Sequence, residues 1–156
     1  MKKLTLISIL LVVLTFTYSC KKDDSGSSNA SFSAKVESTL YTGATMVAVH
    51  ATGGNTTQII ASGTMPSEQI GLYFKGSGTG TYTFDELGYN SGMVNVGSYT
   101  FFSSSKDVPV GQIVITKYDV DNKLISGTFS FEGEDGSGNN YHVTEGKFEN
   151  VSLTEM

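Results

Sequence analysis

The sequence of 156 residues has one cysteine, two prolines, no tryptophan and no arginine. A single cysteine has no partner for an internal disulfide, so the fold is expected to form without one. All ten basic residues are lysines, and fifteen residues are acidic. Nucleic-acid binding depends on positive charge and favours the arginine fork, so this composition argues against a nucleic-acid partner. It also argues against electrostatic docking on an anionic membrane surface.

A long apolar run occurs only at the start of the chain. Two lysines precede an apolar stretch over residues 4–14, which only Thr5 and Ser8 interrupt. This order is typical of a secretory signal. The run is shorter than the ~20 residues that a membrane-spanning helix needs. The sequence therefore predicts a signal peptide over residues 1–19 and no transmembrane helix.

The position of the cysteine indicates a lipid anchor. Ser19 and Cys20 follow the apolar run, and the arrangement resembles a bacterial lipoprotein signal. The resemblance implies that Cys20 becomes the first mature residue and carries a diacylglycerol on its sulfur. Thr17 departs from the leucine that is commonest there, and Tyr18 is bulkier than usual. The alternative is an ordinary secretory signal with an incidental cysteine.

The residues after the cysteine resemble an export signal. Lys22, Asp23 and Asp24 are similar to the lysine and two acids that follow the lipidated cysteine in Bacteroidota surface lipoproteins. The resemblance implies a location on the outer membrane, facing the cell exterior. A solvated linker of mixed charge is the alternative. Residues 20–30 contain the serines and glycine of a flexible tether, which leaves a domain over residues 31–154.

The domain has the composition and the periodicity of an all-β fold. Its glycines suit turns and its many Tyr and Phe residues suit pleated faces. No window has a convincing helical period, whereas many segments alternate apolar and polar residues. We predict a single antiparallel β-sandwich of about 8–10 strands, with a closed, lipocalin-like barrel as the alternative. The predicted strands are 32–36, 44–51, 56–65, 68–76, 81–84, 93–105, 111–119, 124–133 and 141–153.

The last third gives the clearest pattern. The hairpin over residues 111–133 places Ile125, Phe129 and Phe131 on one face, and we expect this face to carry much of the core. Its turn over residues 120–123 is expected to hold Asp121 and Asn122 at positive φ. Phe148 is out of phase with Val143, which predicts a β-bulge near Glu145 and Gly146.

A family resemblance rests on the same region. The segments GQIVITKYD, ISGTFSF and VTEGKFENV lie between residues 111 and 151. This pattern resembles a family of small Bacteroidota lipoproteins of unknown function. The resemblance implies a β-rich domain behind a lipoprotein signal. It implies no activity and no catalytic residues.

Motifs for chemistry are weak. His50 and His142 are far apart in sequence and lack a third metal ligand, so they are interpreted as ordinary strand histidines. No serine lies in a Gly-x-Ser-x-Gly elbow. The glycines of residues 76–80 lack the lysine and helix of a phosphate loop. No catalytic residue, metal ligand or cofactor is predicted.

Acidic residues supply the remaining candidates. Residues 132–140 hold closely spaced oxygen ligands for calcium but lack the EF-hand order, so a solvated hairpin loop is the favoured interpretation. Asp119 and Asp121 form a second acidic pair. A hydrolase would need a carboxylate pair such as Glu132 with Glu145.

The expected function is therefore non-catalytic. We expect a binding or adhesion module whose partner is a glycan or an envelope protein. An extracellular hydrolase and a structural envelope component are the alternatives. A deep pocket with converging carboxylates would favour the hydrolase.

Overall fold

The computed structural model describes residues 29–65, 67–105 and 107–156. The predicted signal peptide, Cys20 and residues 22–24 lie outside this part of the chain. The described residues form eleven strands and one 3-10 turn over Ser103–Ser105, and no α-helix. The strands are β1 (Ser31–Val36), β2 (Thr39–Thr42), β3 (Thr45–Ala51), β4 (Thr56–Ser62), β5 (Gln69–Lys75), β6 (Gly80–Thr83), β7 (Ser91–Val96), β8 (Tyr99–Phe102), β9 (Gly111–Asp119), β10 (Leu124–Glu134) and β11 (Asn140–Glu155).

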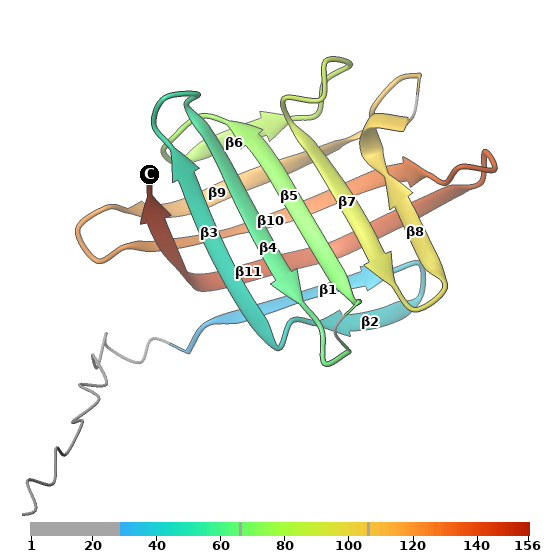
Figure 1. The fold of residues 1–156 in the computed structure, drawn as a ribbon, viewed down its shortest axis with the longest axis horizontal. Helices are drawn as coiled ribbons and strands as arrows, with labels where there is room; N and C mark the ends of the chain where they lie inside the picture. The colour runs from blue at the N-terminus through green and yellow to red at the C-terminus, as the bar shows by residue number, and fades with distance from the viewer. Residues whose placement is uncertain (1–28, 66, 106) are drawn as a thin grey trace, which may run out of the picture.

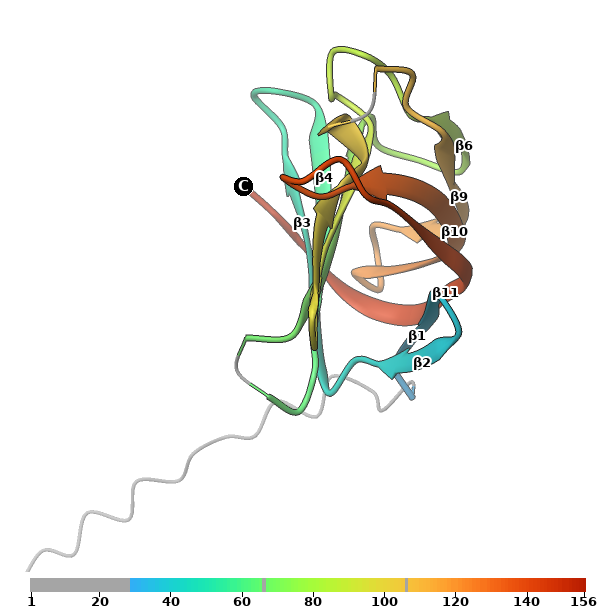
Figure 2. The same ribbon diagram turned by 90° about the vertical axis from the view of Figure 1, so that its right-hand side faces the viewer.

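The strands lie in two layers (Figures 1 and 2). One layer has the order β3-β4-β5-β7-β8, and the other has the order β2-β1-β11-β10-β9-β6. The last residues of β11 cross to the first layer, where Leu153–Glu155 pair with β3. A single pair between Phe102 and Glu134 joins β8 to β10. The strands thus form one continuous, folded-over sheet rather than a closed barrel, and the all-β prediction is confirmed.

One pairing differs from the antiparallel prediction. β11 runs parallel to β3, with Leu153 opposite Ala48 and Glu155 opposite His50. All other pairings in the described residues are antiparallel. The parallel contact follows from the length of β11, whose sixteen residues span one layer and reach the other. The described strands also number eleven, above the predicted eight to ten.

Alternating side chains build the core between the layers. In β5 the inward side chains of Ile70, Leu72 and Phe74 are fully buried, as the sequence predicts. In β10 the same is true of Ile125, and Phe129 and Phe131 are each only 3% exposed. Burying a large apolar side chain contributes roughly 1.5–3 kcal/mol. Successive side chains of a strand point to opposite faces, so the apolar residues at every second position determine which face packs into the core.

Glycines make room for the aromatic side chains of this core. A Cβ at Gly92 would lie 2.6 Å from the Phe131 ring, and one at Gly146 would lie 2.6 Å from the Phe129 ring. At Gly127 a Cβ would meet the main-chain carbonyl of Val114. At these three positions, therefore, any larger residue would displace a neighbouring ring or strand.

The predicted bulge in the last strand is confirmed. Glu145 has a φ of 52°, and the pairing of β11 with β1 and with β10 shifts at this position. A second bulge follows at Asn150, which has a φ of 49°. These extra residues return Phe148 and Val151 to the buried face. They also bend β11, which allows it to pair with β1 and β10 in one layer and with β3 in the other.

The segment over residues 93–105 was predicted as one strand, and that prediction is wrong. Gly97 has a φ of 59°, and it lies in the turn between β7 and β8, which pair as a hairpin. A central glycine in an apolar run therefore marks a turn here and not a break within a strand.

Three smaller differences concern the other strands. β2 was not predicted, because four residues are too few to show a clear alternation. β3 is less buried than its apolar sequence indicates, and Val47 is 42% exposed. In the turn after β9 the positive φ falls on Lys123, at 54°, and not on Asp121 or Asn122. The Asp119 carboxylate, at the end of β9, accepts hydrogen bonds from the backbone N–H and the side-chain amide of Asn122. These hydrogen bonds stabilise the turn.

Within residues 29–65, 67–105 and 107–156, no helix is long and apolar enough to cross a membrane.

Candidate functional site

The two histidines do not form a common site, because His50 lies in β3 beside the end of β11 and His142 lies near the start of β11. His50 is buried next to the pairing position of Glu155, whereas His142 is exposed near the start of β11. The Thr57 hydroxyl donates to the Gly76 carbonyl at 2.7 Å, so its only hydrogen is used. We therefore assign the proton of the His50 imidazole to Nδ1, which lies 3.0 Å from Thr57 Oγ1. His50 acts as a polar member of the core.

The exposed histidine lies between two carboxylates. His142 Nδ1 is 3.2 Å from Glu37 Oε1, and His142 Nε2 is 4.0 Å from Glu132 Oε1. Among the described residues, no group of three or more His, Cys, Asp or Glu side chains is placed to hold a metal ion. This cluster is a set of surface contacts between the turn after β1, β10 and β11.

The carboxylate pair that a hydrolase would need, Glu132 with Glu145, lines neither of the two hollows found in the described residues. Glu145 pairs with Lys35 at 2.7 Å, and both side chains are exposed. Glu132 neighbours His142 on the same outer surface. Neither carboxylate lines the two hollows described below. This geometry lacks the cleft in which a general acid and a nucleophile would face each other.

The acidic loop between β10 and β11 is organised by one aspartate. The Asp135 carboxylate accepts hydrogen bonds from the backbone N–H groups of Ser137 and Asn139, from Asn139 Nδ2 and from the Tyr141 hydroxyl. These hydrogen bonds, with the Asn139 side chain first, lower the pKa of Asp135 to about 2. The same contacts engage both oxygens of the Asp135 carboxylate. The loop is therefore built as a hydrogen-bonded turn.

We expect the Asp135 carboxyl to titrate near pH 2 in an NMR titration. Asn139→Ala removes its strongest donor and should raise the Asp135 pKa toward the ordinary value of 3.8. Because folding lowers this pKa, Asp135 stabilises the domain above pH ~4 and loses that effect as the pH falls toward 2. Tyr141→Phe, which removes a weaker donor, should raise the pKa less. An Asp135 pKa that stays the same in Asn139→Ala would contradict this network.

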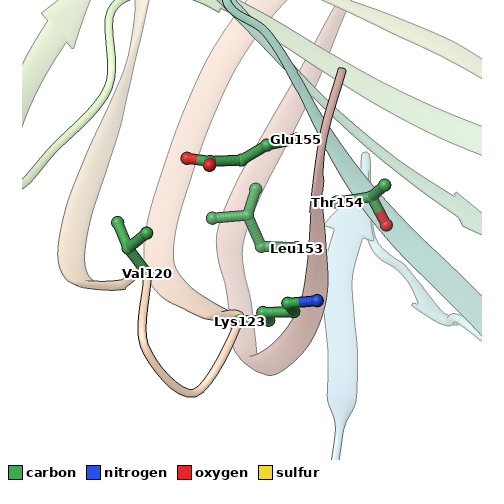
Figure 3. Close-up of a pocket in the computed structure, with 5 residues that line it drawn as sticks. All are labelled: Val120, Lys123, Leu153, Thr154 and Glu155. Carbon is green, nitrogen blue, oxygen red and sulfur yellow. The ribbon is translucent and has the colours of Figure 1, made fainter.

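A small pocket lies between the turn after β9 and the last residues of β11 (Figure 3). Its volume is about 200 Å³, and Val120, Lys123, Leu153, Thr154 and Glu155 line it. Leu153 and Glu155 extend from β11 toward the side on which Val120 lies, while Thr154 points the other way. Ligand pockets usually measure about 300–1,000 Å³. This pocket is below that range, so it is the weaker candidate.

A larger hollow opens at the end of the sandwich where β1 turns into β2, β4 into β5 and β7 into β8 (Figure 1). Its volume is about 550 Å³. We call it the hydroxyl-lined hollow. Its lining residues are 36, 39–42, 64, 68 and 96–99.

The floor and the rim of the hydroxyl-lined hollow differ in character. Buried Val36, Tyr41 and Val96 provide its apolar part. The hydroxyl groups of the exposed or half-buried lining residues surround that part. They belong to Thr39, Thr42, Thr64, Ser98 and Tyr99. None of these five hydroxyls has a hydrogen-bond partner among the described residues.

One acidic side chain, Glu68, lines the same hollow. Glu68 is half-buried, and a Cβ at Gly63 would lie 2.6 Å from its Oε2 and 3.2 Å from the Tyr41 ring. The absent side chain at Gly63 therefore leaves room for the Glu68 carboxylate beside Tyr41. Burial and then the charge of Glu68 raise the pKa of Tyr41 to about 12. The Tyr41 hydroxyl stays protonated and donates to the Ala61 carbonyl at 2.9 Å.

Sequence reasoning missed this hollow. Its residues come from three separate turns and from β2, which has only four residues. The only local signal is one aromatic residue, Tyr41, which turns inward between exposed Leu40 and Thr42. The lipidation residue Cys20 and the export residues Lys22, Asp23 and Asp24 lie outside the described residues.

Comparisons with known proteins give one finding. No curated protein and no solved structure matches the chain. A family model described as "Domain of unknown function (DUF6252)" matches residues 28–152, which is most of the chain and includes β1 to β10. This agrees with the expectation of an uncharacterised family. The chain therefore belongs to the family described as Domain of unknown function (DUF6252).

Proposed function

We propose that this protein is a lipid-anchored module of the outer membrane that faces the cell exterior and binds a ligand without catalysing a reaction. The observation that carries the binding role is the hydroxyl-lined hollow. Its volume of about 550 Å³ lies within the range of ligand sites. It also groups polar side chains that have no partner among the described residues. Exposed hydroxyls that make no hydrogen bond within the fold can exchange bound water for a ligand.

The anchor is proposed from the sequence. Cys20 follows a signal-like segment, and Lys22, Asp23 and Asp24 resemble an export signal. Two acyl chains anchor a protein stably, whereas one chain gives only marginal binding. A diacylglycerol on Cys20 would therefore hold the protein at the membrane. The tether over residues 20–30 would leave the domain free to meet a ligand.

The alternatives have less support. An extracellular hydrolase would need Glu132 and Glu145 to face a substrate, and these side chains lie on open surface with their own partners. A structural role in the envelope would need a surface that binds neighbouring envelope proteins. No observation on the described residues favours that role over ligand binding.

Cell fractionation and protease shaving test the location. Cys20→Ser should move the protein out of the membrane fraction and abolish labelling by a palmitate analogue. Shaving of intact cells should remove the wild-type protein. The double variant Asp23→Ala/Asp24→Ala should stay membrane-bound but become protected from the protease, because it would remain on the inner leaflet of the outer membrane. A Cys20→Ser protein that stays at the membrane, or equal shaving of both lipidated forms, would contradict the proposal.

A further inference from the structure

We infer that the hydroxyl-lined hollow is a saccharide-binding site and that its ligand is a neutral sugar unit of a glycan. This inference rests on the proposed binding function and names its ligand class. Three properties of the hollow carry it, namely its charge, its hydrogen-bonding groups and its apolar floor.

The charge of the hollow excludes anions. Among the described residues that line the hollow, Glu68 alone is charged and none is a lysine. Its carboxylate has no hydrogen-bond or ion-pair partner among the described residues. A half-buried carboxylate without a partner favours ligands that donate hydrogen bonds and repels phosphates, sulfates and acidic sugars. Two adjacent hydroxyls of a sugar can donate to the two oxygens of one carboxylate.

The hydroxyl groups distinguish a sugar from a cation. Each of Thr39, Thr42, Thr64 and Ser98 offers one donor as well as acceptor lone pairs. An ammonium group has three donors and no acceptor, so it would leave the donors of these exposed hydroxyls to water. A sugar hydroxyl donates and accepts, as the rim does. A ring of such side chains beside one carboxylate therefore fits a neutral polyhydroxylated ligand better than an amine.

The apolar lining residues of the hollow can contact the apolar face of a sugar ring. Leu40, which is 67% exposed, forms the accessible apolar part of the lining, above Val36, Tyr41 and Val96, which are each at most 8% exposed. A sugar ring has apolar C–H faces as well as a rim of hydroxyls. Such a ring can place a C–H face on this floor while its hydroxyls reach the surrounding side chains. Most ligand sites combine an apolar lining with a few placed polar groups in this way.

The test uses the mature domain on an array of neutral oligosaccharides, built from glucose, mannose, galactose and xylose, with lysine-rich peptides on the same array. We expect at least one neutral glycan to bind. Glu68→Gln should weaken that binding about 10- to 100-fold, because a hydrogen bond to a charged group is lost. Thr64→Val, which replaces one hydroxyl by a methyl group, should weaken it less. Glu86→Gln makes the same charge change in an exposed loop away from the hollow and should bind like the wild type.

Thermal melts of all variants establish that each is folded. Binding of no neutral glycan by the folded wild type overturns the inference, as does binding of the lysine-rich peptides alone. Equal glycan affinity of wild type and Glu68→Gln places the sugar elsewhere and also overturns it. None of these results affects the proposed anchor and display, which fractionation and shaving test separately.

Discussion

Phe129→Ala should destabilise the domain by about 3–5 kcal/mol, a large part of the roughly 5–15 kcal/mol that holds a domain folded. The side chain is 3% exposed, and its ring centroid lies 5.2 Å from that of Phe32 and 6.3 Å from that of Phe148. These rings come from β10, β1 and β11, so the substitution opens a cavity where three strands meet. The midpoint of a thermal melt should fall by roughly 10–25 °C.

Ser130→Ala is the matched control for this prediction. Ser130 is the next residue of β10 and is exposed on the opposite face. Its substitution should change the free energy of unfolding by no more than about 0.5 kcal/mol. Similar melting temperatures for the two variants would show that the assignment of inner and outer faces in β10 is wrong.

Gly127→Ala should destabilise the domain by about 3 kcal/mol or more, at the upper end of what overpacking a core costs. A Cβ at this position would collide with the main-chain carbonyl of Val114 and lie 2.8 Å from the Phe148 ring. Val114 belongs to β9, which pairs with β10 on both sides of this point. The carbonyl can move only if that ladder is disturbed, so the clash is not relieved cheaply. Chemical denaturation measures the loss.

Gly136→Ala provides the comparison at an exposed loop. A Cβ there would meet nothing within 4 Å, and the backbone is not in the left-handed region. The substitution should leave stability unchanged or raise it by about 0.4–1 kcal/mol, because it restricts the unfolded chain. If both alanine variants unfold at the same denaturant concentration, the close packing of β9 on β10 is not as described.

The sequence alone was sufficient to predict those features that depend on residues close together in the chain. Ile113 and Ile115 occupy alternate positions of β9, and both are buried. The phase change between Val143 and Phe148 located the bulge at Glu145, because one extra residue reverses every later side chain. Gly97 shows the limit of such reasoning. A glycine in an apolar run is compatible with a strand or a turn, and only the pairing of β7 with β8 decides between them.

Long-range features had no local signal. The parallel contact of Leu153 with Ala48 joins residues about a hundred positions apart. The hydroxyl-lined hollow likewise forms where three turns meet, so Glu68 and Thr39 come together only in the folded chain. The candidate site was therefore missed, whereas the acidic loop that drew attention in the sequence is a hydrogen-bonded turn around Asp135.

Labelling of intact cells by a fluorescent neutral glycan tests display and binding together. The probe is the oligosaccharide that the array identifies. Cells that express the wild-type protein should bind it, and protease shaving should abolish the signal. Cells with equal amounts of surface-exposed Glu68→Gln should bind about 10- to 100-fold more weakly, as the loss of a charged hydrogen bond requires. Equal labelling of wild-type and Glu68→Gln cells, or labelling that survives shaving, would contradict a displayed module that holds a sugar in this hollow.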